Sequence, residues 1–150
     1  MTLLRTTSEN GDFQQLVSLL DTFLAEVNGS DHGVYSQFNG IAVLRHVVVA
    51  YLDNVPVGCG AFKPFDGNSV EIKRMYIDPA QRGRGIGGGI LAELEAWSHE
   101  LGCQACVLET SVKLPAANRL YAKSGYEAIP NYGQYVDMPD SVCFRKNLIP

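Results

Sequence analysis

Five glycines fall within residues 83–89 and lie beside two arginines, so this segment carries the clearest chemical signal in the sequence. Glycine lets the backbone approach a ligand closely and adopt conformations that other residues avoid. An amphipathic helix should begin at Ile86, and the first N–H groups of a helix have no partner within it. Together with Arg82 and Arg84 they favour binding of a phosphate or pyrophosphate. A flexible surface turn is the alternative, although each interior glycine costs a helix about 1 kcal/mol relative to alanine.

Two nucleotide-binding motifs can be tested against this segment. The Walker pattern GxxxxGK[ST] is absent, which argues against a nucleoside triphosphatase. Gly83, Gly85 and Gly88 match the dinucleotide pattern GxGxxG, and Glu109 lies 21 residues after Gly88. In NAD(P)-binding folds, however, these glycines directly follow the first strand of a β-α-β unit. Several expected strands precede the match here, so an NAD(P)-type dinucleotide-binding protein is the weaker hypothesis.

The apolar pattern predicts a mixed α/β fold with a partly antiparallel sheet. A first helix should have Asp12 as its N-cap and end near Asn28-Gly29. β-branched residues predict an interior strand over 46–52, and Asp53-Asn54 should turn it into a hairpin with 57–62. The other expected elements are strands at 3–6, 69–77, 105–110, 126–128 and 142–147, helices at 86–101 and 115–125, and an irregular segment at 30–45.

Composition indicates a globular protein and argues against several function classes. The chain has 150 residues, of which 46% are hydrophobic and 19% charged, so we expect one domain over 1–150. A net charge of −4 gives no nucleic-acid footprint, and no apolar run approaches the ~20 residues of a membrane span. Cys103 and Cys106 form one CxxC, but Cys106 falls in an expected strand, which favours reduced, buried cysteines over a redox pair. The N-terminus does not resemble a signal peptide, so we expect a cytoplasmic protein.

Three segments resemble the motifs of one enzyme family. They are, in chain order, Met75-Tyr-Ile-Asp-Pro79, Arg82-Gly-Arg-Gly-Ile-Gly87 and Leu120-Tyr121-x-x-x-Gly125-Tyr126. The second is similar to the acetyl-coenzyme A signature of the GNAT superfamily of N-acetyltransferases, and the other two flank it as they do in that family. The resemblance, over roughly residues 46–128, implies a sheet of about six or seven strands with about four flanking helices. It also implies acetyl-CoA as co-substrate, an amine-bearing small molecule or peptide as acceptor, and in many members a homodimer.

The resemblance implies which residues hold the coenzyme. Backbone N–H groups of the glycine turn would bind the pyrophosphate, and the preceding strand would pair with the pantetheine arm. An Asn that often contacts the pantetheine corresponds to Leu114 here, so Asn118, one helical turn later, is the substitute candidate, with a plain surface Asn as the alternative. The implied coenzyme-binding residues are Met75, Tyr76, Ile77, Arg82, Gly83, Arg84, Gly85, Ile86, Gly87 and Asn118.

Acetyl transfer to an amine needs a proton acceptor, because a primary amine with a pKa near 10.4 is protonated at neutral pH. Glu71 is the candidate base, and strand alternation places it on one face with Met75 and Ile77 unless a bulge intervenes. Its position, thirteen residues before Arg84, is similar to that of the base in the histone-acetyltransferase branch. An exposed Glu paired with Lys73 is the structural alternative, and many relatives use water chains or other acids as the base.

Tyr121 lies at the family's tyrosine position and is the candidate acid for the departing thiolate, with a core aromatic as the alternative. Arg74 and Glu109 could bind substrate charge or form surface ion pairs. A non-catalytic module that senses acyl-CoA also stays open as a function. Acceptor specificity is expected in the segments 28–45 and 129–141, where Tyr132-Gly-x-Tyr135 resembles a subset of bacterial members without an assigned chemistry.

Overall fold

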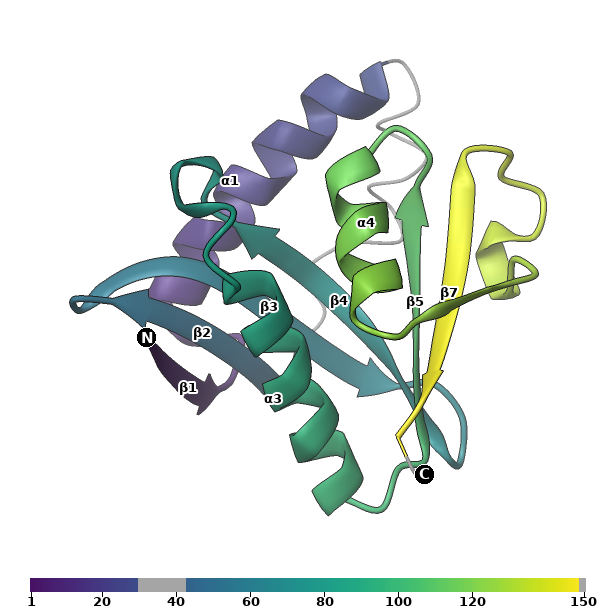
Figure 1. Ribbon diagram of the computed structural model, residues 1–150, viewed down its shortest axis with the longest axis horizontal. Coiled ribbons are helices and arrows are strands. Elements are labelled where there is room, and N and C mark those ends of the chain that lie inside the picture. Colours follow the sequence, from purple (N-terminus) through teal and green to yellow (C-terminus); the bar gives the residue numbers. More distant parts are fainter. Residues whose placement is uncertain (30–42, 149–150) are drawn as a thin grey trace. The chain divides into compact units, whose positions relative to one another are not determined.

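A computed structural model describes residues 1–29 and 43–148, which form a seven-stranded sheet and three α-helices (Figure 1). The strand order is β1-β2-β3-β4-β5-β7-β6, with β4 and β5 parallel and the β1–β2, β2–β3, β5–β7 and β6–β7 pairs antiparallel. This confirms the mixed, partly antiparallel sheet, whereas the expected irregular segment at 30–45 lies mostly outside the described residues. The elements are β1 (Thr2–Thr6), α1 (Gly11–Asn28), β2 (His46–Leu52), β3 (Val55–Pro64), β4 (Ser69–Ile77), the 3-10 turn η2 (Pro79–Gln81), α3 (Ile86–Glu100), β5 (Ala105–Ser111), α4 (Pro115–Lys123), β6 (Glu127–Ile129), the 3-10 turn η3 (Gly133–Tyr135) and β7 (Ser141–Asn147).

The start of α1 differs from the prediction. Its N-cap is Asn10, whose Oδ1 accepts a hydrogen bond from the backbone N–H of Phe13 at 2.9 Å. Asp12 lies in the first turn instead, and its carboxylate accepts a hydrogen bond from the Tyr51 hydroxyl at 2.7 Å. The prediction of Asp12 as N-cap is therefore wrong, because Asn and Asp cap helices almost equally well and local sequence does not separate them.

The β2–β3 hairpin turns as predicted. Asp53 and Asn54 both adopt left-handed conformations, with φ of 50° and 66°. Two consecutive residues with positive φ match the twist of the flanking strands, and Asn and Asp tolerate this conformation better than most residues. The turn thereby sets the register in which β2 pairs with β3.

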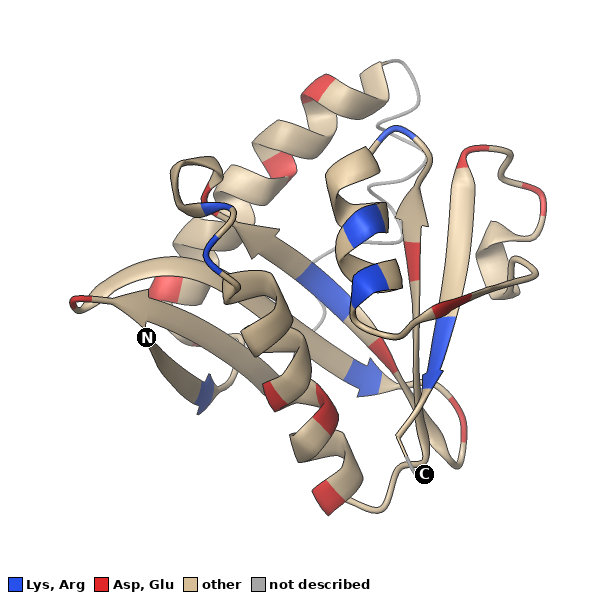
Figure 2. Cartoon of the chain, viewed as in Figure 1, with Lys and Arg blue, Asp and Glu red and all other residues tan. Residues whose placement is uncertain are grey.

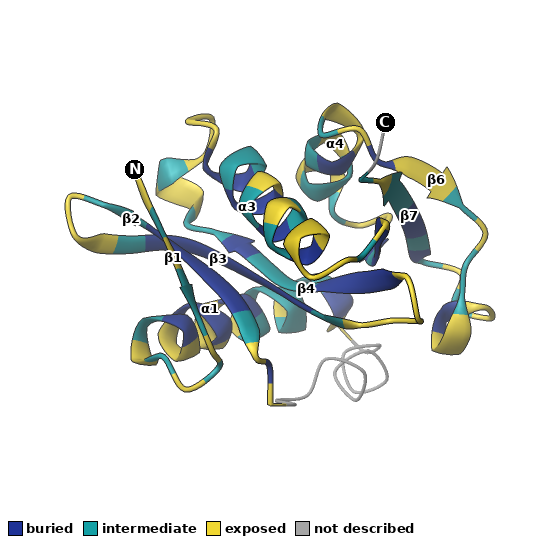
Figure 3. Cartoon of the chain, turned by 90° about the horizontal axis from the view of Figure 1, so that it is seen from below, coloured by how far each residue is buried: buried dark blue, intermediate teal, exposed yellow. Residues whose placement is uncertain are grey.

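The described chain divides into two compact units, and β4 and α3 contribute residues to both. The first unit contains Met1–Lys63 and Lys73–Leu94, and the second contains Pro64–Ile72 and Glu95–Pro150. In the first unit α1 covers one face of the sheet and the first half of α3 covers the other, while the strands between them are largely buried (Figure 3). The core on the α1 face joins four helix residues to strand residues: Phe13, Leu16, Val17, Leu20, Val47, Val49, Cys59 and Ala61.

The α3 face of the first unit depends on two glycines in β3. A Cβ added at Gly60 would lie 2.5 Å from Sδ of Met75, 2.9 Å from Cγ2 of Ile90 and 3.0 Å from Cδ1 of Leu94. Ile90 and Leu94 are both fully buried. The helix therefore approaches β3 closely because β3 presents no side chain there.

Gly60→Ala should lower the free energy of unfolding by about 1–3 kcal/mol, because a methyl group must displace closely packed side chains. The matched control is Gly11→Ala at the start of α1, where an added Cβ meets nothing within 4 Å. Urea unfolding of both variants measures the difference. Equal stability of the two variants would contradict the close approach of α3 to β3.

In the second unit β5 is the central strand. It pairs with β4 from Ser69↔Ala105 to Glu71↔Val107 and with β7 from Ala105↔Asn147 to Ser111↔Ser141. The β4–β5 ladder thus ends while both strands continue, β4 to Ile77 and β5 to Ser111.

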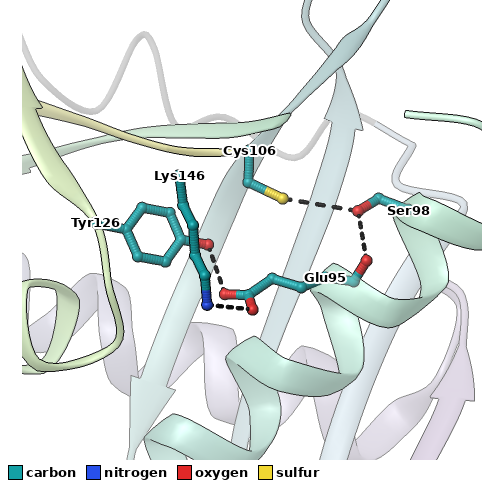
Figure 4. Close-up of polar contacts among 5 residues, drawn as sticks. All are labelled: Glu95, Ser98, Cys106, Tyr126 and Lys146. Atoms are coloured by element: carbon teal, nitrogen blue, oxygen red, sulfur yellow. Dashed lines mark hydrogen bonds and ion pairs between the residues drawn. The ribbon is translucent and has the colours of Figure 1, made fainter. Parts of the chain in front are cut away.

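A buried polar cluster ties the second half of α3 to the strands of this unit (Figure 4). The carboxylate of Glu95 accepts hydrogen bonds from the Tyr126 hydroxyl at 3.0 Å and from Nζ of Lys146 at 2.8 Å. Ser98 donates to the backbone carbonyl of Glu95 at 3.0 Å and lies 3.6 Å from the thiol sulfur of Cys106. Because the Glu95 side chain is only 12% exposed, both of its charge-assisted contacts stabilise this part of the fold.

Within the described segments, no helix combines the length and the apolar character needed to cross a membrane.

Candidate active site

The glycine turn joins β4 to α3 through η2. Asp78 caps η2 by accepting a hydrogen bond from the backbone N–H of Ala80 at 3.0 Å, which sets the direction of the chain toward the turn. Gly83 and Gly85 then adopt φ of 83° and 77°, in the left-handed region that favours glycine. No atom lies within 4 Å of a Cβ added at either position, so the backbone there borders open space. The structure thus confirms a turn, directly before α3, that needs its glycines.

The start of α3 is also electrostatically suited to an anion. Its first turn contains no acidic residue, whereas α1 has Asp12 in its first turn and Asn10 as its cap. The two cationic residues of the turn, Arg82 and Arg84, lie immediately before the helix in the sequence, and both are exposed. Figure 2 shows the cationic residues of the chain in blue. The positive end of the helix dipole and two guanidinium groups therefore act at the same place.

Met75, Tyr76 and Ile77 form the end of β4, beyond the segment that pairs with β5. Arg74, just before them, has a φ of 59°, which interrupts the extended backbone. The Met75 side chain lies over Gly60, next to α3 residues Ile90 and Leu94. The β4–β5 ladder ends at Glu71, and strand groups outside a ladder can pair with an extended ligand.

The left-handed Arg74 bears on the alternation argument for Glu71. In the second unit Val70 is paired with Cys106, which contacts Ser98 of α3, so Glu71 faces away from that helix. The φ of 59° at Arg74 then interrupts the extended backbone between Glu71 and Met75. Strict alternation therefore does not hold over this segment, and a shared face for Glu71 and Met75 stays a prediction.

The Arg74 side chain has a structural contact. It is only 6% exposed, and its Nη1 lies 2.7 Å from Oδ1 of Asp21 on α1. Its carbonyl oxygen accepts a weak hydrogen bond from the Cys59 thiol at 3.4 Å. The sequence allowed Arg74 either to bind substrate charge or to form an ion pair, and the structure shows an ion pair with Asp21.

Glu71 is buried in the second unit, at 3% exposure, and is hydrogen-bonded to an aromatic cluster. The Tyr132 hydroxyl donates to Oε2 of Glu71 at 2.7 Å. The Tyr132 ring makes edge contacts with Phe65 and Tyr135, at centroid distances of 4.8 and 5.8 Å. A carboxylate with a hydrogen-bond donor in a largely apolar surrounding is an arrangement that general bases use.

Glu109 lies two residues beyond the β5 partner of Glu71. Its Oε2 accepts a hydrogen bond from the Ser141 hydroxyl at 2.8 Å. Burial and then the charge of Glu109 raise the pKa of Tyr135 above its usual value, so this phenol stays neutral. Glu109 thus adds negative charge to the region of the second unit that contains Tyr135. Its contact with Ser141 is a hydrogen bond to a neutral hydroxyl, unlike the surface ion pair considered above.

Tyr121 lies on α4 and is 6% exposed. Its ring packs against Tyr126 and Phe144, with centroids 6.0 Å away in both cases. Burial, and next the nearby charge of Glu109, raise the pKa of Tyr121 well above its ordinary value. The hydroxyl is therefore protonated at neutral pH, as a proton donor must be.

Asn118 has a role that sequence reasoning did not find. Its Nδ2 donates hydrogen bonds to the backbone carbonyls of Ser111 and Leu114, both at 2.8 Å. Leu114 is the N-cap of α4 and provides no side-chain cap. Asn118 thus fastens the β5–α4 turn, and this use of its amide nitrogen supports a structural role over coenzyme contact.

All four cysteines are free thiols. Burial raises the pKa of Cys59 to about 12 and that of Cys106 to about 11. Cys106 lies in β5, as predicted, and not at the start of a helix. These features favour ordinary reduced cysteines over a redox pair.

Comparison with known proteins now decides the family. Residues 14–126 match the family described as Acetyltransferase (GNAT) family, across both units. The chain belongs to the GNAT family of acetyltransferases. It is therefore an acyltransferase whose co-substrate is acetyl-CoA.

Individual relatives agree with the assignment of this chain to the GNAT family. It is 30% identical to an IAA acetyltransferase from Azospirillum brasilense, over 89% of each chain. A Klebsiella pneumoniae structure, provisionally described as an acyl-CoA N-acyltransferase, matches with a TM-score of 0.81 and 27% identity over 99% of this chain and 97% of that one. An aminoglycoside 6'-N-acetyltransferase in complex with coenzyme A shares the fold, with a TM-score of 0.73 and 19% identity over 100% and 98% of the two chains.

Proposed function

We propose that this GNAT acetyltransferase transfers the acetyl group of acetyl-CoA to a primary amine on a small molecule, an amino acid or a peptide. The observation that carries the proposal is the buried Glu71, hydrogen-bonded to Tyr132 in the second unit. A primary amine is protonated at neutral pH, so the acceptor needs a nearby carboxylate to take its proton before it can attack. The negative charge of Glu71 and Glu109 also suits an acceptor that arrives as a cation.

The coenzyme is proposed to bind through the first unit. Backbone N–H groups from Gly83 to Gly87, with Arg82 and Arg84, would hold its pyrophosphate. The open space beside Gly83 and Gly85 and the absence of acidic residues in the first turn of α3 support this role. The Met75–Ile77 segment would pair with the pantetheine arm, and its position beyond the β4–β5 ladder supports this role. Asn118 has less support as a coenzyme contact, because its amide nitrogen already donates to two backbone carbonyls.

The proposed chemistry balances in four proton transfers. The acceptor ammonium gives one proton to Glu71, and the resulting amine attacks the thioester carbonyl carbon to form the C–N bond. The C–S bond then breaks, and the departing sulfur takes a proton from the neutral Tyr121 hydroxyl. The amide nitrogen loses its second proton, which restores the phenol, and Glu71 releases its proton to water. Coenzyme A, the acetylated amine and one proton are the products.

The experiment that tests this function measures thiol release from acetyl-CoA across a panel of acceptors. The panel contains amino acids, peptides with free N-termini, diamines, an aminoglycoside and IAA, the last two because relatives carry those names. Amine-dependent release of coenzyme A is the expected result. Stabilisation by acetyl-CoA without release for any amine would instead favour the acyl-CoA-sensing module.

Two further expectations belong to this proposal. The four free thiols suit a reducing compartment, and we propose the cytoplasm as the site of action. Homodimer formation is also proposed, on the resemblance to the family, and its test is the mass of the protein in solution.

A further inference from the structure

The Tyr132-Gly-x-Tyr135 motif has no role in the function described so far, yet it lies beside the proposed base. Tyr132 is the N-cap residue of η3, and its hydroxyl reaches Oε2 of Glu71 across 61 residues of chain. The edge contacts with Phe65 and Tyr135 hold the Tyr132 ring on two sides. Few rotamers are compatible with both ring contacts and the 2.7 Å hydrogen bond, so the donor has a defined direction.

The environment keeps Tyr132 a donor. Burial, and then the charge and hydrogen bond of Glu71, raise the pKa of Tyr132 far above its usual value. The phenol therefore carries its proton throughout the neutral range, in which Glu71 is the acceptor of the pair.

Several other titratable or charged groups lie near Glu71 on the elements around it. Burial raises the pKa values of Tyr135 from η3 and Cys143 from β7, and the charge of Glu71 adds to both shifts. Glu109 from β5 acts on the same two groups. Two cationic residues lie on neighbouring positions of the sheet. Arg145 of β7 pairs with Val107, which is the β5 partner of Glu71. Lys73 follows Glu71 by two residues on β4. The Tyr132 hydroxyl contacts the Glu71 carboxylate directly, at 2.7 Å.

We propose that Tyr132 is a positioning residue, which holds the Glu71 carboxylate in one orientation for proton transfer from the acceptor. This inference rests on the proposed function of Glu71 as the base. Proton transfer requires the accepting oxygen to lie at hydrogen-bond distance from the acceptor and in a suitable direction. Without the Tyr132 hydroxyl the carboxylate loses one of the contacts that fix this direction.

The test compares Tyr132→Phe with Tyr51→Phe in steady-state assays with acetyl-CoA and the best amine of the panel. Tyr51 is a matched control, because its hydroxyl also donates to a carboxylate at 2.7 Å, that of Asp12, in the other unit. Tyr132→Phe should lower kcat about tenfold, while KM for acetyl-CoA stays within about twofold. Tyr51→Phe should leave kcat within about twofold of its value in the unaltered protein.

The outcomes separate this inference from the proposed function. An unchanged kcat in Tyr132→Phe overturns the role of Tyr132, even if Glu71→Gln abolishes turnover. Full turnover in Glu71→Gln overturns the assignment of the base, and the role of Tyr132 fails with it. An equal loss of kcat in Tyr51→Phe also overturns the inference, because the loss would then reflect a general loss of stability.

Discussion

Glu71→Gln should lower kcat by about a hundredfold to a thousandfold at neutral pH and leave KM for acetyl-CoA nearly unchanged. The amide keeps the size of the side chain and still accepts a hydrogen bond from Tyr132, but it cannot take a proton from an ammonium group. General base catalysis contributes about 10²–10⁴ in rate, which sets the expected size of the loss. Initial rates of coenzyme A release at saturating acetyl-CoA measure it.

Glu127→Gln is the control for the base, because Glu127 is an exposed strand residue of the same unit. It should keep kcat within about twofold of the unaltered protein, as is usual for surface substitutions. If Glu71→Gln retains its rate as well, the proton must leave the acceptor by another route, such as a chain of water molecules. Recovery of the lost rate at high pH, where the free amine itself becomes abundant, would support the assignment.

Gly85→Ala should raise KM for acetyl-CoA by about tenfold to a hundredfold, with little change in kcat. The residue has a φ of 77°, and a Cβ there costs about 1–2 kcal/mol if the conformation is kept. The added methyl group would also project into open space beside the backbone N–H groups that are proposed to hold the pyrophosphate. Hydrogen bonds to charged groups contribute about 1.5–3 kcal/mol each, so misdirecting one or two of them accounts for the range.

Gly102→Ala separates backbone strain from coenzyme binding. Gly102 has a φ of 93°, also with nothing within 4 Å of an added Cβ, but it follows the other end of α3. Both variants should lose similar stability in urea unfolding, and only Gly85→Ala should show a smaller thermal stabilisation by acetyl-CoA. Equal KM values in the two variants would mean that the glycine turn does not hold the coenzyme.

The order of elements and the glycine turn could be predicted because each depends on local chemistry. The hairpin at Asp53-Asn54, the helix after the glycines and the strand that contains Cys106 all follow from propensity and apolar spacing within short segments. The wrong N-cap shows the limit of that reasoning, since Asn10 accepts from the backbone N–H of Phe13 whereas Asp12 accepts from the Tyr51 hydroxyl, 39 residues away.

The failures concern contacts that join distant residues. Nothing near Arg74 in the sequence indicates a left-handed backbone, because Asp21, which pairs with this arginine, is 53 residues away. The bond from Tyr132 to Glu71 spans 61 residues, and only the unexplained Tyr-Gly-x-Tyr motif could have drawn attention to it. The amide of Asn118 was likewise beyond prediction, since its use depends on how the preceding turn closes.

The position of β7 between β5 and β6 has a consequence for synthesis on the ribosome. β6 is made before β7, yet β7 is its neighbour in the sheet, so β6 must wait as an unpaired segment until the later strand emerges. Tyr126, directly before β6, forms its bond to Glu95 beside Lys146, which is itself part of β7. A nascent chain that stalls before β7 would therefore expose backbone groups of both β5 and β6, a state that chaperones recognise and that favours aggregation.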